Sequence, residues 1–273
     1  MAAREPAIAV QDLVKVYKTT RAVDGISFAL MPGSVTGLLG GNGAGKTTTI
    51  AIILGLLTPT SGSVRVLGAE MPRQRNRVLA RMNFESPYVD MPHRLTVRQN
   101  LAVFGRLYAV ADLSARIGEL TSELDLGEFL DRPTGGLSAG QKTRVALAKA
   151  LINSPDVLLL DEPTASLDPD TADWVRTRLE RYRVERGATV LLASHNMAEV
   201  ERLCDRVIIM KRGRIEDDDT PERLLARYGR ETLEEVFLDV ARGRGEAAQG
   251  AAQQGAAQQG AAQQEAAQQE AAQ

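Results

Sequence analysis

Hydrophobic and polar positions divide this chain into a β-rich beginning and a helical middle. Residues 7–30 alternate apolar and polar side chains around a turn-like break at 18–21, which predicts antiparallel strands joined by a hairpin-like turn. A further strand is expected at 64–67, after a break rich in Thr, Ser, Pro and Gly. Between residues 96 and 152 apolar side chains recur every three or four positions, which predicts helices.

Short, continuous apolar runs predict a second group of strands. The run Val35–Leu39 enters a glycine-rich loop, and residues 46–57 follow it with the apolar content and length of a helix. The runs Val157–Leu160 and Thr189–Leu192 are rich in Val and Leu, as is typical of parallel strands buried on both faces. A helix at about 170–185 would supply the crossover between them. These patterns predict an α/β fold with a helical insertion.

The last segment, residues 246–273, has a different composition. It repeats Ala-Ala-Gln-Gln with Gly or Glu in fifth place. A five-residue period draws no continuous apolar stripe on a helix, and the repeated glycines oppose helix formation. We expect a disordered or fraying tail; a docking role is the alternative, and no residue supports it. The expected organisation is a domain at 1–245, with a helical subdomain inserted at about 86–152, followed by this tail.

Composition narrows the classes of partner. The chain has 273 residues and a formal net charge of −2, with both signs well mixed, which gives no electrostatic case for a nucleic-acid partner. Cys204 is the only cysteine, which excludes an internal disulfide and fits a reducing compartment. No secretory signal is visible, and no apolar run approaches the ~20 residues that span a bilayer. A soluble chain is expected, so any membrane part must come from another polypeptide.

The segment GGNGAGKTT fits the phosphate-binding pattern G-x-x-x-x-G-K-[ST]. It follows an expected strand and opens an expected helix, so its backbone N–H groups and the helix N-terminus can face an anion. Lys46 is expected to reach the β- and γ-phosphates, and the Thr47 hydroxyl to ligate Mg²⁺. The predicted nucleotide-binding residues are Gly40, Gly41, Asn42, Gly43, Ala44, Gly45, Lys46, Thr47 and Thr48.

Two carboxylates and a histidine follow expected buried strands. Asp161 and Glu162 end the run VLLLDE, which places them at the carboxyl edge of the sheet, where α/β proteins bind ligands. Asp161 is expected to hold Mg²⁺, directly or through water. Glu162 is the candidate to orient or deprotonate the attacking water. His195 follows the next strand and is expected to contact the γ-phosphate.

Five motifs in a fixed order resemble those of the ATP-binding cassette (ABC) family over roughly residues 7–215. They are GGNGAGKTT, LSAGQ, VLLLDEP, SLD and SH. LSAGQ carries the resemblance most strongly, and it departs from the family's usual LSGGQ only at Ala139. The resemblance implies a P-loop NTPase core of RecA-like α/β fold, with an N-terminal antiparallel β-subdomain and an inserted helical subdomain.

The resemblance also implies a mechanism and partners. Two ABC ATPase chains, identical or paired, would face head to tail and sandwich two ATP molecules, each with Mg²⁺. ATP hydrolysis would drive a separate transmembrane permease, with the ATPase at the cytoplasmic face of the cell membrane. The residues matching the family's further nucleotide contacts are Tyr17, Ser138, Ala139, Gly140, Gln141 and Asp168.

Particular residues have particular expected roles in this scheme. Ser138 and the backbone of Gly140 begin a helix whose N-terminus attracts the γ-phosphate held by the opposite chain. Asp168 resembles the aspartate that crosses the dimer interface. Tyr17 matches the aromatic residue that stacks on adenine, although a tyrosine with ordinary packing in a hairpin remains an alternative.

Two positions depart from the family pattern. Where a glutamine usually contacts Mg²⁺ or the lytic water, the aligned residue is Glu85, which has no N–H donor and adds negative charge near the metal. We expect Glu85 still to couple the lobes but to alter Mg²⁺ affinity or hydrolysis rate. Gly41 stands where proline is frequent and is expected to loosen the loop.

The direction of transport rests on resemblance. The stretches NFESPYVDMPHRLTVRQNL and TLEEVFLDVARG resemble those of exporter-type cassettes, although the second is equally well explained as a closing amphipathic helix. An importer ATPase is the nearest alternative. A soluble ABC ATPase of DNA repair or translation and a non-catalytic ATP-gated binding module are two further ones. The sequence of this chain does not identify the transported substrate.

Overall fold

The computed structural model describes residues 5–86, 90–165 and 167–243. Contacts divide the chain after Asp218 into two compact units. In chain order the elements are β1 (Ile8–Tyr17), β2 (Thr20–Leu30), β3 (Val35–Leu39), α1 (Lys46–Ile53), β4 (Ser61–Val66), β5 (Ala69–Met71), η1 (Arg75–Arg77), η2 (Leu79–Arg81), β6 (Met82–Glu85), α2 (Val97–Leu107), α3 (Leu113–Glu123), η3 (Gly127–Phe129), η4 (Thr134–Gly136), α4 (Ala139–Leu151), β7 (Val157–Asp161), α5 (Pro169–Arg186), β8 (Thr189–Ala193), α6 (Met197–Leu203), β9 (Arg206–Lys211), β10 (Arg214–Asp219), α7 (Pro221–Tyr228) and α8 (Leu233–Ala241).

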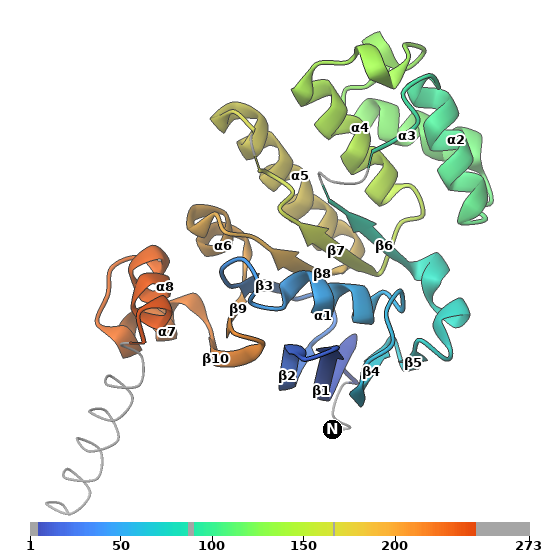
Figure 1. Cartoon of the computed structure of the whole chain (residues 1–273). Helices are drawn as coiled ribbons and strands as arrows, with labels where there is room; N and C mark the ends of the chain where they lie inside the picture. The colour runs from blue at the N-terminus through green and yellow to red at the C-terminus, as the bar shows by residue number, and fades with distance from the viewer. Residues whose placement is uncertain (1–4, 87–89, 166, 244–273) are drawn as a thin grey trace, which may run out of the picture. The chain divides into compact units, whose positions relative to one another are not determined.

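A four-stranded sheet in the order β2-β1-β4-β5 forms the N-terminal part of the first unit (Figure 1). Its adjacent strands are antiparallel, and β1 joins β2 from Ile8↔Leu30 to Tyr17↔Thr20. The turn therefore lies at Lys18–Thr19, inside the break expected from the sequence. Alternating residues of these strands are buried in one hydrophobic core with α1, as a sheet with one covered face requires.

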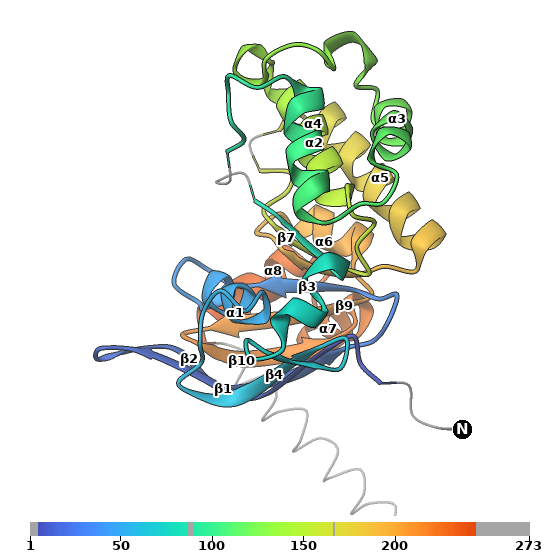
Figure 2. The same ribbon diagram turned by 90° about the vertical axis from the view of Figure 1, so that its right-hand side faces the viewer.

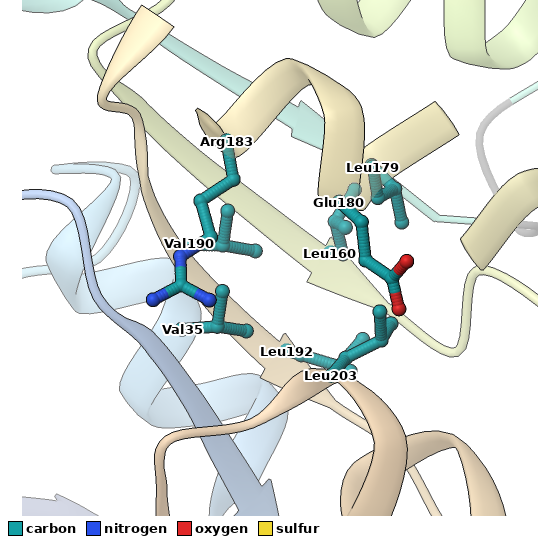
Figure 3. Close-up of a pocket in the computed structure, with 8 residues that line it drawn as sticks. All are labelled: Val35, Leu160, Leu179, Glu180, Arg183, Val190, Leu192 and Leu203. Carbon is teal, nitrogen blue, oxygen red and sulfur yellow. The ribbon is translucent and has the colours of Figure 1, made fainter. Parts of the chain in front are cut away.

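The second sheet has six strands in the order β10-β9-β3-β8-β7-β6. From β9 through β3, β8 and β7 to β6, each strand is parallel to the next. Every residue of β3, β7 and β8 is buried, because successive side chains alternate between two covered faces. Leu159 and Leu191 belong to the core shared with α1, whereas Leu160 and Leu192 face Leu179 of α5 (Figure 3).

A small pocket beneath α5 is a feature of this packing. Its lining is mainly aliphatic, and Glu180 and Arg183 lie at its rim (Figure 3). Arg183 is already engaged: its Nε donates to the carbonyl of Gly33 at 3.0 Å and it pairs with Asp205 at 2.8 Å. No polar group converges on the pocket interior, so we interpret it as a packing gap rather than a ligand site.

Helices α2, α3 and α4 lie between β6 and β7 in the chain, and both views show them together beyond the β6 edge of the large sheet (Figures 1 and 2). Buried leucines from this region include Leu101, Leu120 and Leu147. Helices α2 and α4 both begin with a capping box, formed by Thr96 with Gln99 and by Ser138 with Gln141 respectively.

The second unit contains helices α7 and α8, which contact each other. Arg230 pairs with Asp239 at 2.7 Å. The segment TLEEVFLDV forms helix α8, with Thr232 as its N-cap. The repeat tail expected at 246–273 lies outside the described residues. Across the residues that the structure describes, no helix combines the length and apolar character needed to cross a membrane.

The predicted α/β fold is confirmed, with differences in detail. The helix expected at 46–57 ends at Ile53, and the crossover helix expected at 170–185 is α5, Pro169–Arg186. Strands β5, β6, β9 and β10 were not predicted. Strand β6 is only four residues long and contains Asn83 and Glu85, both buried, so it lacks the apolar run that marked β3, β7 and β8. The limits predicted for the domain and for its inserted subdomain remain predictions.

Candidate functional site

Four neighbouring parallel strands end at one edge of the large sheet and bring the predicted motifs together. In register, Leu38 of β3 pairs with Ala193 of β8, and Ala193 pairs with Asp161 of β7. Residue Glu85 of β6 pairs with Leu160, one position before Asp161. The glycine-rich loop, the carboxylates, the histidine and Glu85 therefore all follow or end strands at the carboxyl edge, where α/β sheets bind ligands.

The loop Gly40–Gly45 joins β3 to α1 in a conformation that glycine makes possible. Gly45 has φ of 105°, and a Cβ there would lie 2.5 Å from the carbonyl oxygen of Ala22. A Cβ on Gly40 would lie 2.7 Å from the carbonyl oxygen of Met210. No side chain caps the N-terminus of α1. The close packing fixes the path of the backbone, and the helix keeps an N-terminus suited to an anion.

The other loop residues differ in exposure. Gly41, Asn42, Gly43 and Thr47 are exposed, Thr48 is half-buried, and Ala44 is buried. The carbonyl of Ala44 accepts a hydrogen bond of 3.0 Å from the N–H of Gly213, in the turn between β9 and β10. The ammonium of Lys46 donates a hydrogen bond to the carbonyl of Gly40, so the Lys46 side chain runs back along the loop. Its charge is therefore held where the loop would meet a phosphate.

Substitution of Gly45 by alanine tests this fit. We expect Gly45→Ala to lower the free energy of unfolding by about 1–3 kcal/mol, because a strained backbone or a shifted loop must accommodate the new Cβ. ATP affinity should fall roughly tenfold, which corresponds to 1.4 kcal/mol. Thermal unfolding and ATP titration measure the two effects.

Gly41→Ala is the matched control for folding. Gly41 has no atom within 4 Å of an added Cβ and is not among the glycines of positive φ. Its thermal unfolding should stay close to that of the unsubstituted chain. Equal stability of the Gly45 and Gly41 variants would contradict the close packing described above.

Asp161 lies at the end of β7 and is 6% exposed. Burial raises the pKa of its carboxyl, the neighbouring charge of Glu162 raises it further, and the charge of Lys46 lowers it. Lys46 therefore acts electrostatically on the carboxylate that the sequence predicts to hold Mg²⁺. A cation bound beside Asp161 would likewise favour its ionised form.

Glu162 and His195 form a direct pair across the ends of β7 and β8. The Nδ1 atom of His195 lies 2.6 Å from Oε2 of Glu162, and the main-chain N–H of His195 donates to the same oxygen at 3.3 Å. The Glu162 side chain is largely buried, whereas the His195 ring is 71% exposed. Glu162 has φ of 57°, a left-handed conformation unusual outside glycine. The structure thus brings together these two predicted catalytic residues.

Glu85 has a partner that the sequence did not indicate. Its Oε2 lies 2.6 Å from Nζ of Lys149, near the end of α4, and both side chains are at most 10% exposed. The same ammonium lies 5.7 Å from the ring centre of Phe104. Burial raises the pKa of Glu85, and Lys149 opposes that shift. A role for Glu85 at Mg²⁺ would require it to leave or share this ion pair, so that role remains a prediction.

The LSAGQ residues form the start of α4, away from α1 in both views (Figures 1 and 2). Ser138 is the N-cap: its Oγ accepts from the N–H of Gln141 at 3.3 Å, and the Gln141 side chain accepts from the N–H of Ser138 at 3.1 Å. Ala139 and Gly140 occupy the first turn. Within the described part of the chain, no hydrogen bond joins these four residues to the phosphate loop, as expected if they serve a second chain.

Asp168 and Tyr17 are the remaining predicted contacts. Asp168 is the N-cap of α5 and accepts from the N–H of Thr171 at 3.0 Å, which lowers its pKa. Its neighbour Ser166 lies outside the described residues. Tyr17 ends β1 with 45% of its surface exposed, and Nζ of Lys15 lies 5.1 Å from its ring centre. An exposed ring is compatible with stacking and with an ordinary hairpin tyrosine.

Three residues near the site were missed by sequence reasoning. They are Lys149, Thr164 and Glu199, each at most 6% exposed. Lys149 pairs with Glu85, and Thr164 bonds Glu199, across long intervals of sequence, so spacing alone gave no signal for these contacts. The capping role of Ser138 could have been predicted from the sequence, because Ser138 and Gln141 fit the S-x-x-Q pattern of a capping box.

Comparisons with known proteins agree with the motif order. A family model described as "ABC transporter" matches residues 23–165. The "Nod factor export ATP-binding protein I" of Paraburkholderia xenovorans (strain LB400) is 40% identical over 224 residues, which cover 81% of this chain and 73% of that protein. The protein of the same name from Burkholderia pseudomallei (strain 1710b) is 39% identical over 241 residues, covering 87% and 79% respectively.

Solved structures share the fold. One described as the ATP-binding subunit of an ABC transporter is 26% identical with a TM-score of 0.79, and the match covers 86% of this chain and 99% of that one. The structure of cbiO1 from Clostridium perfringens, described as part of the ABC transporter complex cbiONQ, is 30% identical with a TM-score of 0.71 and covers 81% and 91%. The predicted P-loop NTPase fold is therefore confirmed.

Proposed function

The chain belongs to the ABC transporter family as its ATP-binding ATPase subunit, and from this premise we propose that it drives export through a separate membrane permease. The observation that carries the proposal is the convergence of the phosphate loop, Asp161 and the Glu162–His195 pair at one sheet edge. The export direction is supported by relatives whose name includes export.

The phosphate loop and Lys46 would bind the phosphates of ATP. The backbone N–H groups of Gly40–Thr48 and the N-terminus of α1 would surround the β- and γ-phosphates, and the Lys46 ammonium would exchange the Gly40 carbonyl for a phosphate oxygen. Tyr17 would stack on the adenine. These contacts position the nucleotide before any chemistry begins.

The donors beside the loop fit Mg²⁺. Thr47 offers an exposed hydroxyl in the first turn of α1, and Asp161 offers a buried carboxylate at the end of β7. Hydroxyl and carboxylate oxygens are the ligands that this ion prefers, with phosphate and water completing its shell. When bound there, the ion would neutralise charge on the transferred phosphoryl group. Thr47 and Asp161 would hold it.

Glu162 and His195 would act on the attacking water. The Glu162 carboxylate would orient the water and accept its proton as oxygen attacks the γ-phosphorus. His195 holds Oε2 of Glu162 in place, and its exposed ring is available to contact the γ-phosphate. Hydrolysis would release ADP and phosphate.

Closure would require a second chain. The N-terminus of α4, with Ser138 as its cap, has the geometry to receive an anion once its own capping contacts rearrange. We propose that two chains pair head to tail, so that LSAGQ and Asp168 of each complete the site of the other. Closure on ATP and opening after hydrolysis would move the permease at the inner face of the membrane.

Glu85→Gln tests the role predicted for Glu85 near the metal. Removing a negative charge there should raise the Mg²⁺ concentration needed for half-maximal turnover by about 10-fold, the lower end of the range seen when groups around a metal's ligands are changed. Steady-state ATP hydrolysis across a Mg²⁺ series measures it. An unchanged rate and Mg²⁺ dependence would restrict Glu85 to its pairing with Lys149.

The proposed function is tested by transport in vesicles that carry this chain together with a candidate permease. Purified Nod factor is the first probe, because the relatives carry that name. Export predicts ATP-dependent accumulation in inside-out vesicles. Accumulation only in right-side-out vesicles would show import, and a failure of the purified chain to hydrolyse ATP, with and without permease, would overturn the proposal altogether.

A further inference from the structure

Glu199, in helix α6, is a fully buried carboxylate close to the proposed catalytic pair. Its exposed fraction is 0%. Both carboxylate oxygens accept hydrogen bonds: Oε1 from the hydroxyl of Thr164 at 2.9 Å, and Oε2 from the hydroxyl of Ser194 at 2.7 Å. The carboxylate therefore joins two segments that lie far apart in the sequence.

These two hydroxyls belong to the segments that carry Glu162 and His195. Thr164 lies two residues after Glu162 and has an exposed fraction of 6%, whereas Ser194 immediately precedes His195 and is fully buried. The catalytic side chains meet at 2.6 Å, and both hydroxyls donate to Glu199. The two strand ends are thus joined by two separate sets of contacts.

A third contact extends this arrangement beyond His195. The main-chain N–H of Asn196 donates to the Ser194 hydroxyl oxygen at 3.1 Å, and the Asn196 side chain accepts from the N–H of Glu199 at 3.3 Å. The two residues that flank His195, Ser194 and Asn196, are therefore both hydrogen-bonded to Glu199. The histidine backbone has little freedom to move away from Glu162.

Burial of this carboxylate is costly for folding. Burial raises the pKa of Glu199, the Ser194 and Thr164 hydroxyls and the charge of Arg176 oppose the shift, and the charge of Glu162 adds to it. A well-packed apolar side chain generally stabilises a core as well as a buried charge does. Stability alone therefore does not explain why a carboxylate occupies this place. Alignment of the two segments that carry Thr164 and Ser194 does explain it.

We propose that Glu199 is a positioning residue for ATP hydrolysis: through the hydroxyls of Thr164 and Ser194 it fixes the distance between Glu162 and His195. The inference rests on the proposed function, in which those two side chains act on the attacking water. Within the described residues Glu199 forms no hydrogen bond or ion pair with either of them, and its effect passes through the two strand ends.

Thr164→Val tests the proposal, because valine keeps the shape of threonine and removes the hydroxyl. We expect kcat for ATP hydrolysis to fall roughly 10- to 100-fold, since small misplacements of catalytic groups have effects of this size. The KM for ATP should stay within about twofold, because the phosphate loop is untouched. Thr164→Ser keeps the hydroxyl and should restore most of the rate. Ser194→Ala, a smaller change, should reproduce the loss and serves if the valine variant does not fold.

A second measurement separates positioning from general damage. In a Glu162→Gln background, Thr164→Val should lower the residual turnover no further, because its effect acts through Glu162. Multiplied losses would overturn the proposal, and so would a kcat within twofold of the unsubstituted chain in Thr164→Val and Ser194→Ala. Glu201→Gln, an exposed position on the same helix, is the matched control and should keep full turnover. Absence of hydrolysis in that control and in the unsubstituted chain would reject the proposed function instead.

Discussion

Glu162→Gln should lower kcat for ATP hydrolysis by about 10²- to 10⁴-fold, the usual contribution of a general base, while ATP still binds. Glutamine keeps the length of the side chain but cannot accept the proton of the attacking water. It can still accept the main-chain N–H of His195, which lies 3.3 Å from Oε2. The phosphate loop and Lys46 are unaffected, so nucleotide affinity should be retained.

The same variant should reveal the proposed dimer. With ATP and Mg²⁺, slow hydrolysis leaves the closed state populated, and size-exclusion chromatography with light scattering should detect twice the monomer mass. ADP should give only monomer. A monomer under every condition would mean that closure needs a permease or a different ABC chain. A turnover close to that of the unsubstituted chain would remove Glu162 from the proposed mechanism, whatever the mass.

Lys149→Met should lower the free energy of unfolding by about 3–5 kcal/mol, the cost of breaking a buried ion pair by removing one partner. Methionine fills a similar volume, so the main loss is the charge that faces Glu85 at 2.6 Å. The side chains are 6% and 10% exposed, so water cannot replace the lost partner without structural change. Urea unfolding measures the difference.

A double-mutant cycle isolates this pair. Adding Glu85→Gln to Lys149→Met removes the unpaired charge and should recover a large part of the stability. Arg98→Met is the matched control, because Arg98 pairs with Asp131 at 2.7 Å where both side chains are more than half exposed; its stability should hardly change. Additive losses at Lys149 and Glu85 would contradict a coupled pair.

The sequence predicted the parts of the fold that have a strong local pattern. Strands β3, β7 and β8 are continuous apolar runs because both of their faces are buried, and β1 and β2 alternate because one face is covered. Strand β6 was not predicted because its buried Asn83 and Glu85 have partners near α4: the carbonyl of Lys149 for Asn83, and the Lys149 ammonium for Glu85. The four residues of β6 contain no sequence pattern that indicates these distant partners.

The candidate site divides in a similar way. Lys46, Asp161, Glu162 and His195 were predicted because each stands at a fixed place beside an apolar run. Glu199 was not, since its two hydroxyl partners come from different strand ends and only folding brings them together. The motif also left open what each side chain contacts, and Glu85 illustrates this: the residue was identified as a departure, but its ion pair with Lys149 was not.

The pairing of β3 has a consequence for synthesis of the chain. Its neighbours in the sheet are β8 and β9, so Val35 finds its partner only when Val190 has been made. At ~5–20 residues per second a ribosome needs roughly 8–30 s to cover that interval. During this time the five residues of β3, all buried in the folded protein, have no neighbouring strand. The phosphate loop that follows β3 also lacks the sheet that positions it. The parallel pairing that positions the phosphate loop therefore forms only after the last third of the chain begins to emerge.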